Sequence, residues 1–223
     1  MGFIAMVINF LRKQYYALIS REFEGMKTVL DVGCGESSLV QRVSNRKDFH
    51  STGVDAYPPS IEASKKLGIH DEHIVADITK LDFSPRSFDA VLSVDVVEHF
   101  EKDEALRLLE KMESWAKKKV IIVTPNGWSP AHLEEGARED ELTTELMRHK
   151  CGWTVDDFQK RGYRVRGMRG FRRLMFHIEK GHAIYVHEEK GIRKLLFNLT
   201  SAITYPFPRL AFQLLAIKDV NGD

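Results

Sequence analysis

Two carboxylates and an imidazole follow a short apolar run near the middle of the chain. The run, FDAVLSV, starts at Phe88, and Asp95, Glu98 and His99 come after it. An apolar run of this length is typical of a buried parallel strand, and open α/β sheets bind ligands beyond the carboxyl ends of their strands. Carboxylates and an imidazole at that edge could transfer a proton or ligate a metal ion. These three residues are therefore the first candidates for catalysis.

A glycine turn earlier in the chain indicates a bound cofactor. The stretch KTVLDVGCGESSLV, residues 27–40, reads as a strand, a turn at Gly33-Cys34-Gly35 and the start of a helix. Glycine lets the backbone turn sharply and lets a ligand approach, and a helix N-terminus offers unpaired N–H groups. Asp55 closes the next expected strand, where a carboxylate can accept both hydroxyls of a ribose. The stretch therefore predicts a nucleoside-containing cofactor.

The residues around the glycines narrow the type of cofactor. The dinucleotide fingerprint G-x-G-x-x-G has a third glycine, and Ser38 occupies that position here. Asp31 lies just ahead of the turn, where its carboxylate would repel a diphosphate and attract an ammonium or sulfonium group. A pyrophosphate-binding loop is therefore poorly supported.

These motifs resemble those of the class I S-adenosylmethionine-dependent methyltransferases. The pattern D-x-G-x-G from Asp31, then Asp55, then Ala76-Asp77-Ile78, resembles motifs one to three of the family, and FDAVLSVDVVEHF and VIIVTPNG extend the resemblance over residues 26–165. The chain departs from the family at Ser37, where many members carry a third glycine. The resemblance implies S-adenosylmethionine as the cofactor. The implied cofactor-binding residues are Asp31, Gly33, Gly35, Asp55, Ala56, Asp77, Ile78 and Ser93.

The resemblance also implies a role for each part of that set. Asp31 would reach the ammonium of the methionine portion, Asp55 would hold the ribose, and Asp77 would accept from the adenine amino group. The N–H of Ile78 would lie near the adenine ring. Methyl transfer then needs mainly orientation, because a sulfonium is already an activated electrophile. A general base is needed only for a poorly acidic hydroxyl or a protonated amine.

The motif D-x-x-E-H at 95–99 is similar to motifs in two groups of methyltransferases. One group acts on small molecules, including quinone-biosynthesis enzymes, where the motif often serves the architecture of the site. The other is the small-RNA 3′-terminal 2′-O-methyltransferases, where it binds a metal together with a His from an H-K-x-x-W-T segment, and HKCGWT at 149–154 fits that form. Two carboxylates and two imidazoles could hold Mg²⁺ or Mn²⁺ and polarise a ribose diol. We predict Asp95, Glu98, His99 and His149 as the catalytic residues, assign no metal ion, and leave plain structural roles open.

Strands and helices alternate along the chain with the rhythm of a parallel sheet. Strands are expected at 27–32, 51–55, 73–76, 88–93, 119–124, 163–168 and 212–218, and helices at 3–22, 36–43, 59–67, 101–117 and 154–161. The resemblance implies an α/β fold with a Rossmann-like, seven-stranded, mostly parallel sheet, helices on both faces and an antiparallel last strand. The expected plan is an N-terminal helix at 1–25, a core at 26–169, an inserted lid or subdomain at 170–209 and a closing core strand at 210–223.

Composition and charge exclude several classes of protein. The 223 residues suit one α/β domain with appendages, and the net charge of +1 gives no overall field for nucleic acid. Cys34 and Cys151 provide no disulfide framework, which favours a reducing, cytoplasmic location. No apolar run reaches the ~20 residues of a membrane span. The opening helix is expected to pack on the sheet, while its apolar tip suggests contact with a partner, a lipid surface or the C-terminal segment, and residues 191–209 leave peripheral membrane contact open.

A basic run at 160–173, KRGYRVRGMRGFRR, has two interpretations. We favour a solvated strand edge that offsets the acidic segment at 134–145. The alternative is a surface for RNA or a phosphorylated substrate, with Tyr163 and Phe171 as stacking surfaces.

Three functional hypotheses follow from these features. The first is transfer of a methyl group from S-adenosylmethionine to a small-molecule acceptor. The second is metal-assisted methylation of an RNA ribose 2′-hydroxyl, and the third is a cofactor-binding regulatory subunit without catalysis. Salt-sensitive RNA binding would separate the second hypothesis from the first.

Overall fold

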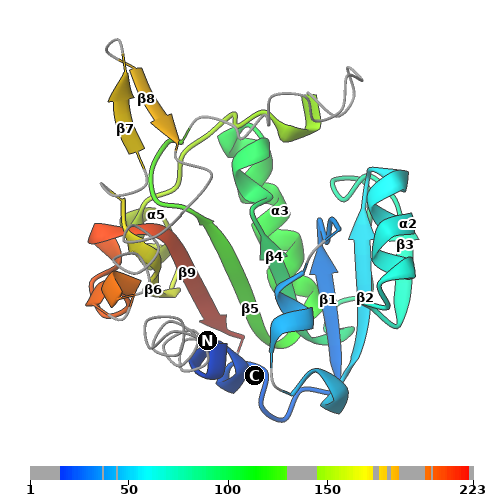
Figure 1. The fold of residues 1–223 in the computed structure, drawn as a ribbon. Coiled ribbons are helices and arrows are strands. Elements are labelled where there is room, and N and C mark those ends of the chain that lie inside the picture. Colours follow the sequence, from blue (N-terminus) through cyan, green and yellow to red (C-terminus); the bar gives the residue numbers. More distant parts are fainter. Residues whose placement is uncertain are drawn as a thin grey trace, which may run out of the picture.

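The structure of the chain is a computed structural model, and Figure 1 shows its fold. It describes residues 16–36, 38–43, 45–129, 145–172, 176–179, 182–185, 199–201 and 203–220. The expected helix at 3–22 is therefore described from residue 16 onward. Nearly half of the expected lid at 170–209 lies outside the described residues, so the predicted plan of segments stays a prediction.

Seven strands form one sheet in the order β3-β2-β1-β4-β5-β9-β6. The strands are β1 (Thr28–Val32), β2 (His50–Asp55), β3 (Glu72–Val75), β4 (Phe88–Val94), β5 (Ala116–Pro125), β6 (Arg164–Phe171) and β9 (Ala211–Asp219). Neighbours from β3 to β5 are parallel, and β9 is antiparallel to both β5 and β6. The predicted seven-stranded, mostly parallel sheet with an antiparallel last strand is confirmed.

Helical segments cover both faces of this sheet, because successive strand residues point to opposite sides. Leu30 of β1 packs with α3 (Lys102–Trp115) and α5 (Val155–Gln159) in one apolar cluster. The next residue back, Val29, packs in a second cluster with the helical segment at 16–21 and the 3₁₀ turn η1 (Leu39–Arg42). Helix α2 (Pro58–Lys66) lies beside β2 and β3 (Figure 1). The sheet is therefore the middle layer of three.

Two boundary predictions are corrected by the structure. The helix expected at 36–43 is wrong, since the described residues there form only η1, which begins where Ser38 Oγ accepts from Val40 N at 3.0 Å. Serine and β-branched residues are poor helix formers, and a serine oxygen competes for backbone N–H groups. The helix expected at 101–117 ends earlier, at Trp115, because β5 begins at Ala116 and is longer than expected.

The C-terminal part contains structure that the sequence did not predict. Strands β7 (Phe176–Glu179) and β8 (His182–Tyr185) pair as a separate antiparallel hairpin within the expected lid. The 3₁₀ turn η5 (Pro208–Leu210) then leads directly into β9. None of the helices in the described part of the chain is long and apolar enough to cross a membrane.

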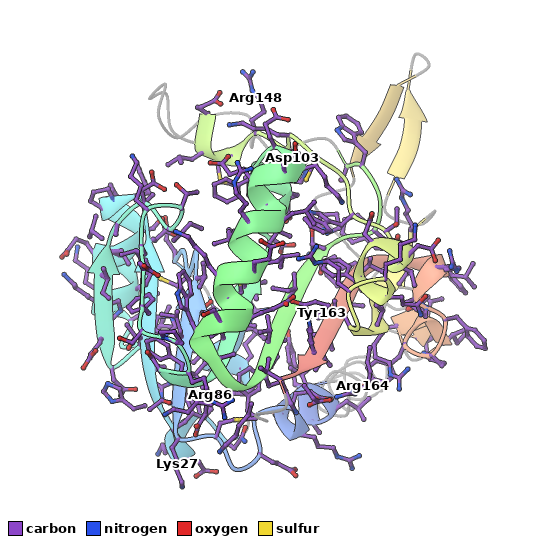
Figure 2. All side chains as sticks on the ribbon, turned by 180° about the vertical axis from the view of Figure 1, so that it is seen from behind. Lys27, Arg86, Asp103, Arg148, Tyr163 and Arg164 are labelled. Carbon is purple, nitrogen blue, oxygen red and sulfur yellow. The ribbon has the colours of Figure 1, made fainter. Side chains whose placement is uncertain are left out.

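The carboxyl ends of the parallel strands gather at one end of the molecule. Figure 2 shows Asp103, near the start of α3, and Arg148 at this end, and Lys27, just before β1, at the other. The connections that follow β1, β2, β4 and β5 are therefore the ones that can meet around a bound ligand.

Candidate active site

The glycine turn after β1 has a fixed shape against the end of β2. Gly33 and Gly35 have positive φ angles of 71° and 55°, which glycine adopts without strain. The N–H groups of Gly33 and Cys34 donate to the Val54 carbonyl at 2.8 and 2.9 Å. A side chain at Gly33 would collide with Val96. The turn is therefore held close to both β2 and the connection after β4.

Asp55 lies at the end of β2 and faces this turn. Its Oδ2 accepts from the N–H of Gly35 at 2.9 Å, and its Oδ1 accepts from the N–H of Tyr57 at 2.8 Å. These hydrogen bonds fix the carboxylate beside the turn, in the position that the sequence predicts for a ribose-binding group. Ala56 is the next residue along the same connection. The cofactor-binding roles of these residues stay predictions.

Asp31 is enclosed beneath the turn and is 1% exposed. Its Oδ2 accepts a hydrogen bond from the hydroxyl of Ser38 and lies 3.4 Å from Nε2 of His70. Burial is the main cause that raises the pKa of Asp31 from 3.8 to about 7, and the Asp55 carboxylate raises it further while Ser38 lowers it. Burial likewise lowers the pKa of His70 to about 4, so its ring is neutral near pH 7. The contact is therefore one between a carboxyl group and a neutral imidazole, longer than a usual hydrogen bond.

The other predicted cofactor-binding residues, Asp77, Ile78 and Ser93, lie just after β3 and near the end of β4. Oδ1 of Asp77 accepts from the N–H and hydroxyl of Thr79 at 3.0 and 2.7 Å, which is the pattern of a turn-capping carboxylate. Ile78 is buried in the same cluster as α3. Ser93 is fully buried near the end of β4, and its hydroxyl has no hydrogen-bond partner in the described structure. An unpaired buried hydroxyl beside the turn fits a site that a polar ligand completes.

Two carboxyl groups follow β4: Asp95 comes directly after the strand, and the buried Glu98 lies within a short 3₁₀ turn, η3 (Val97–His99). Asp95 has a φ of 52°, and its Oδ1 accepts from Nε2 of Gln213 at 2.7 Å. Glu98 is 2% exposed, with Oε2 accepting from the Thr124 hydroxyl at 2.9 Å and Oε1 unpaired among the described residues. Burial raises the pKa of Asp95 to about 6, against the lowering effect of the Arg169 charge. Burial and then the charge of Asp95 raise the pKa of Glu98 well above its usual value.

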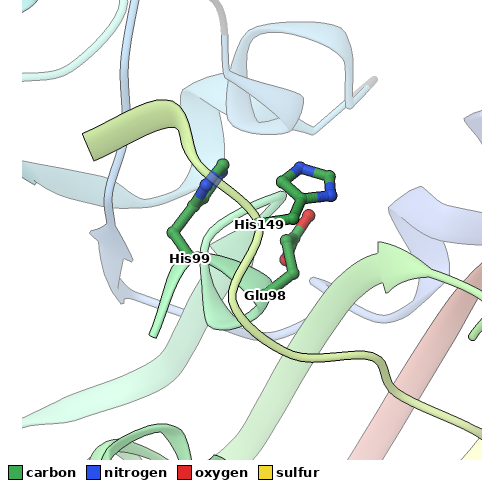
Figure 3. Close-up of side chains that lie close together, drawn as sticks. All are labelled: Glu98, His99 and His149. Carbon is green, nitrogen blue, oxygen red and sulfur yellow. The ribbon is translucent and has the colours of Figure 1, made fainter. Parts of the chain in front are cut away.

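His99 and His149 are brought together from segments 50 residues apart, with ring centroids 4.8 Å from each other. Figure 3 shows both rings grouped with the carboxylate of Glu98. The segment carrying His149 is tied to η3, because the Glu98 carbonyl accepts from the N–H of Lys150 at 2.8 Å. Nδ1 of His149 lies 2.8 Å from the carbonyl oxygen of Ser129, which can only accept, so Nδ1 carries the proton. The lone pair of the neutral ring is therefore on Nε2.

The side chains of Glu98, His99 and His149 could hold a metal ion. One ligand atom from each lies within 4.8 Å of the others, and Oε1 of Glu98 has no hydrogen-bond partner among the described residues. Both ring nitrogens of His99 face carbonyl oxygens, of Arg148 at 3.2 Å and Asp95 at 3.1 Å. A neutral ring can donate to only one of them, so its other nitrogen keeps a lone pair that a cation would stabilise. The donor set fits a cation, and its two imidazoles favour a transition-metal ion over Mg²⁺.

Asp95, the fourth member of the predicted catalytic group, stands apart from this cluster. Its Oδ1 is held by Gln213 on β9, and the metal-capable group contains three residues rather than four. Sequence reasoning missed Gln213 and Thr124, which hold the two carboxylates, and His70, which lies against Asp31. These partners come from distant strands and carry no motif. Only Ser38 had a local signal, as the residue at the third glycine position.

Comparisons with known proteins agree with this geometry. A family model described as a methyltransferase domain matches residues 29–119. A protein of Methanocaldococcus jannaschii is 25% identical over 169 residues, which cover 74% of this chain and 69% of that protein. The small RNA 2′-O-methyltransferase of Arabidopsis thaliana is 30% identical over 168 residues, which cover 65% of this chain but only 18% of that protein. A solved SAM-dependent methyltransferase from Archaeoglobus fulgidus has the same fold, with a TM-score of 0.55, 17% identity and coverage of 98% of this chain and 95% of that one.

The matched region carries the parts of the site that the sequence singled out. Residues 29–119 include the glycine turn, Asp55, and the segment from Asp95 to His99. The sheet order and the antiparallel last strand agree with the fold that the resemblance implied. Residues 29–119 match the methyltransferase domain, the fold is that of solved S-adenosylmethionine-dependent methyltransferases, and the cofactor that these similarities support is S-adenosylmethionine.

Proposed function

We propose that this chain transfers a methyl group to a hydroxyl oxygen of a small-molecule acceptor, with His149 as the general base. The observation that carries the proposal is the orientation of His149. Its Nδ1 is held by the Ser129 carbonyl at 2.8 Å, and its ring meets His99 at the sheet edge that also carries the glycine turn. A base fixed in one tautomer beside the cofactor loop suits an acceptor whose proton must be removed.

The residues around the glycine turn hold the cofactor in this proposal. When bound, S-adenosylmethionine supplies a methyl group on a positively charged sulfur, and the C–S bond breaks as the acceptor oxygen bonds to that carbon. The Asp55 carboxylate, fixed by the Gly35 and Tyr57 N–H groups, accepts from the ribose hydroxyls. Asp31 contributes negative charge beneath the methionine portion. The protein thereby supplies orientation, which is the main requirement of an activated donor.

Removal of the acceptor proton falls to His149. Burial lowers the pKa of His149, so the ring is neutral near pH 7 and able to accept a proton. The hydroxyl proton passes to Nε2, and the resulting imidazolium lies beside the Glu98 carboxyl group. A general base in this position contributes typically about 10²- to 10⁴-fold to the rate.

The cluster of Glu98, His99 and His149 favours a second candidate, metal-assisted methylation of an RNA ribose 2′-hydroxyl. The 30% identity to the Arabidopsis small RNA 2′-O-methyltransferase supports it. A bound divalent cation would polarise the acceptor hydroxyl and lower its pKa. In both candidates the same three side chains surround the acceptor oxygen. The candidates differ in the requirement for a metal and in the size of the acceptor.

The remaining parts of the proposal concern the surroundings of the enzyme. We infer a cytoplasmic location, which the two free, buried cysteines support. Cofactor-binding without catalysis is the third hypothesis, and a methyl-transfer assay decides it. The predicted division into a core at 26–169 and a lid at 170–209 is kept as part of the proposal.

The test is a transfer assay with radiolabelled S-adenosylmethionine on a panel of catechols, other phenols and short single-stranded RNAs, with and without a chelator. We expect labelled small-molecule product that the chelator leaves unchanged. His149→Asn should lower the rate about 10²- to 10⁴-fold while binding S-adenosylhomocysteine normally. His50→Asn is the matched control, because His50 is half-exposed at the far end of β2. RNA product that the chelator abolishes would establish the second candidate, and full activity in His149→Asn would contradict the role of the base.

A further inference from the structure

Trp128 stands out as a large aromatic side chain that the fold leaves exposed. Its side chain is 60% exposed, whereas the other two tryptophans, Trp115 and Trp153, are 1% and 0% exposed. Tryptophan is one of the largest sources of apolar burial in a folded protein, and it is highly buried on average. The exposed indole therefore contributes little to the core.

The backbone of Trp128 is nevertheless held on several sides. Its carbonyl accepts from the guanidinium of Arg172 at 2.9 Å, and the preceding residue, Gly127, pairs with Trp153 in an isolated β-bridge. A Cβ atom at Gly152 would lie 2.6 Å from the Trp128 nitrogen, so only glycine lets the two segments approach this closely. The chain thus fixes the backbone from which the indole projects, which is the arrangement of a preorganised contact residue.

The same two segments carry the proposed base. The residue after Trp128 is Ser129, whose carbonyl oxygen orients His149 at 2.8 Å. Gly152, packed against the Trp128 nitrogen, is three positions after His149. The indole and the imidazole are therefore supported by one pair of mutually bonded loops. The backbone positions that carry the two rings are thus fixed relative to each other.

We propose that Trp128 is the stacking surface for a planar aromatic ring of the methyl acceptor. The proposal rests on the proposed function, since it places the ring next to the hydroxyl that His149 deprotonates. An indole face can stack on any flat aromatic ring. Each nucleobase that stacks on an aromatic side chain contributes to the binding free energy, whatever the sequence. The ring can come from an aromatic small molecule or from a terminal nucleobase, and both present the same flat face to the indole. Trp128 is then a residue that sets specificity, selecting flat acceptors over saturated ones.

The exposure of the three tryptophans makes this inference measurable by fluorescence. Trp115 and Trp153 are buried, so iodide should quench only Trp128, and the spectrum lost in Trp128→Phe is that of Trp128 alone. We would titrate catechol, cyclohexane-1,2-diol and a short single-stranded RNA into the wild-type protein saturated with S-adenosylhomocysteine. Catechol or the RNA should quench Trp128 saturably and protect it from iodide, and the saturated diol should do neither. Salt-dependent quenching identifies the RNA as the source of the ring. Salt-independent quenching identifies the small molecule as the source.

Variants separate this proposal from the proposed function. Measured by calorimetric titration, since these variants lack the reporting indole, Trp128→Ala should lose about 5- to 150-fold in affinity for the probe that quenches the wild type, and Trp128→Phe should recover most of it. Both variants should bind S-adenosylhomocysteine as the wild type does. Leu67→Ala is the control for removal of an equally exposed apolar side chain, at 61%, beyond the end of α2. Equal quenching by catechol and the diol, or an unchanged probe affinity in Trp128→Ala, would overturn the stacking role. Loss of S-adenosylhomocysteine binding in the wild type would instead overturn the proposed function.

Discussion

Nε2 of His70 lies 3.4 Å from Oδ2 of Asp31, beneath the glycine turn. Both side chains are buried, and the hydroxyl of Ser38 donates to the same carboxylate oxygen. On the far side of the ring, Nδ1 lies 3.3 Å from Oγ of Ser51, whose N–H and hydroxyl donate to Asp71. A chain of polar contacts therefore links the predicted ammonium-binding carboxylate to a half-exposed carboxylate at the opposite edge of the sheet.

The raised pKa of Asp31 predicts that the protein loses stability as pH rises from about 4 to about 7. Burial raises this pKa from 3.8 to about 7, so in this range the folded chain holds a proton that the unfolded chain has released. A pKa shift of about three units corresponds to a loss of about 4 kcal/mol in the free energy of unfolding, and this loss is complete above pH 7. Asp31→Asn removes the titrating group and should give a flatter profile and a more stable protein at pH 8. Urea unfolding across this pH range measures the effect, and an unchanged profile in Asp31→Asn would assign it to another group.

Gly53 should not accept a side chain, because His70 fills the space beside it. A Cβ atom at Gly53 would collide with Cδ2 of His70 and lie 2.9 Å from Sγ of Cys34. We expect Gly53→Ala to cost about 1–3 kcal/mol of the free energy of unfolding. Combining it with His70→Ala should cost less than the two single changes together, since the imidazole is then absent. Strict additivity in denaturant unfolding would contradict the contact.

The cap of helix α5 can be tested at Thr154. Its Oγ1 accepts from the N–H of Asp157 at 3.3 Å, while its own N–H donates to Oδ2 of Asp157 at 2.8 Å, so the two residues form a capping box. Thr154→Ala should destabilise the protein by about 1 kcal/mol, and Thr154→Ser, which keeps the oxygen, by much less. Equal losses in the two variants, measured by urea unfolding, would show that the hydroxyl does not stabilise the helix.

The predictable part of this structure is the part encoded locally. The sequence predicts all seven strands near their observed positions, and the continuous apolar runs of β1, β4 and β5 are the pattern of buried parallel strands. The sequence predicts a helix from residue 154, and the capping box of Thr154 confirms that helix α5 starts there. The order of the motifs along the sequence predicts that the glycine turn and Asp55 lie at the same edge of the sheet, and the hydrogen bond from the Gly35 N–H to Asp55 agrees with this.

The hydrogen-bond partners of Asp95 and Glu98 could not be predicted, because they come from distant strands. Gln213 on β9 reaches Asp95 across 118 positions of sequence, and Thr124 on β5 reaches Glu98 across 26. Neither partner belongs to a local pattern, and a buried carboxylate needs only some donor in the right place. The helix expected at 36–43 was wrong for a related reason, since the Ser38 hydroxyl both caps η1 and donates to Asp31. Tertiary contacts decided the local structure there.

The central claim is that the glycine turn and Asp55 form a site for S-adenosylmethionine, and calorimetric titration tests it most directly. S-adenosylhomocysteine should bind the wild-type protein with micromolar affinity, or about −8 kcal/mol. Asp55→Ala should lose most of this affinity, because it removes both the ribose contact and the hydrogen bond from the Gly35 N–H. His50→Asn, at the other end of the same strand, should bind as the wild type does. Absence of binding to the wild type, or equal binding to Asp55→Ala, would contradict the claim.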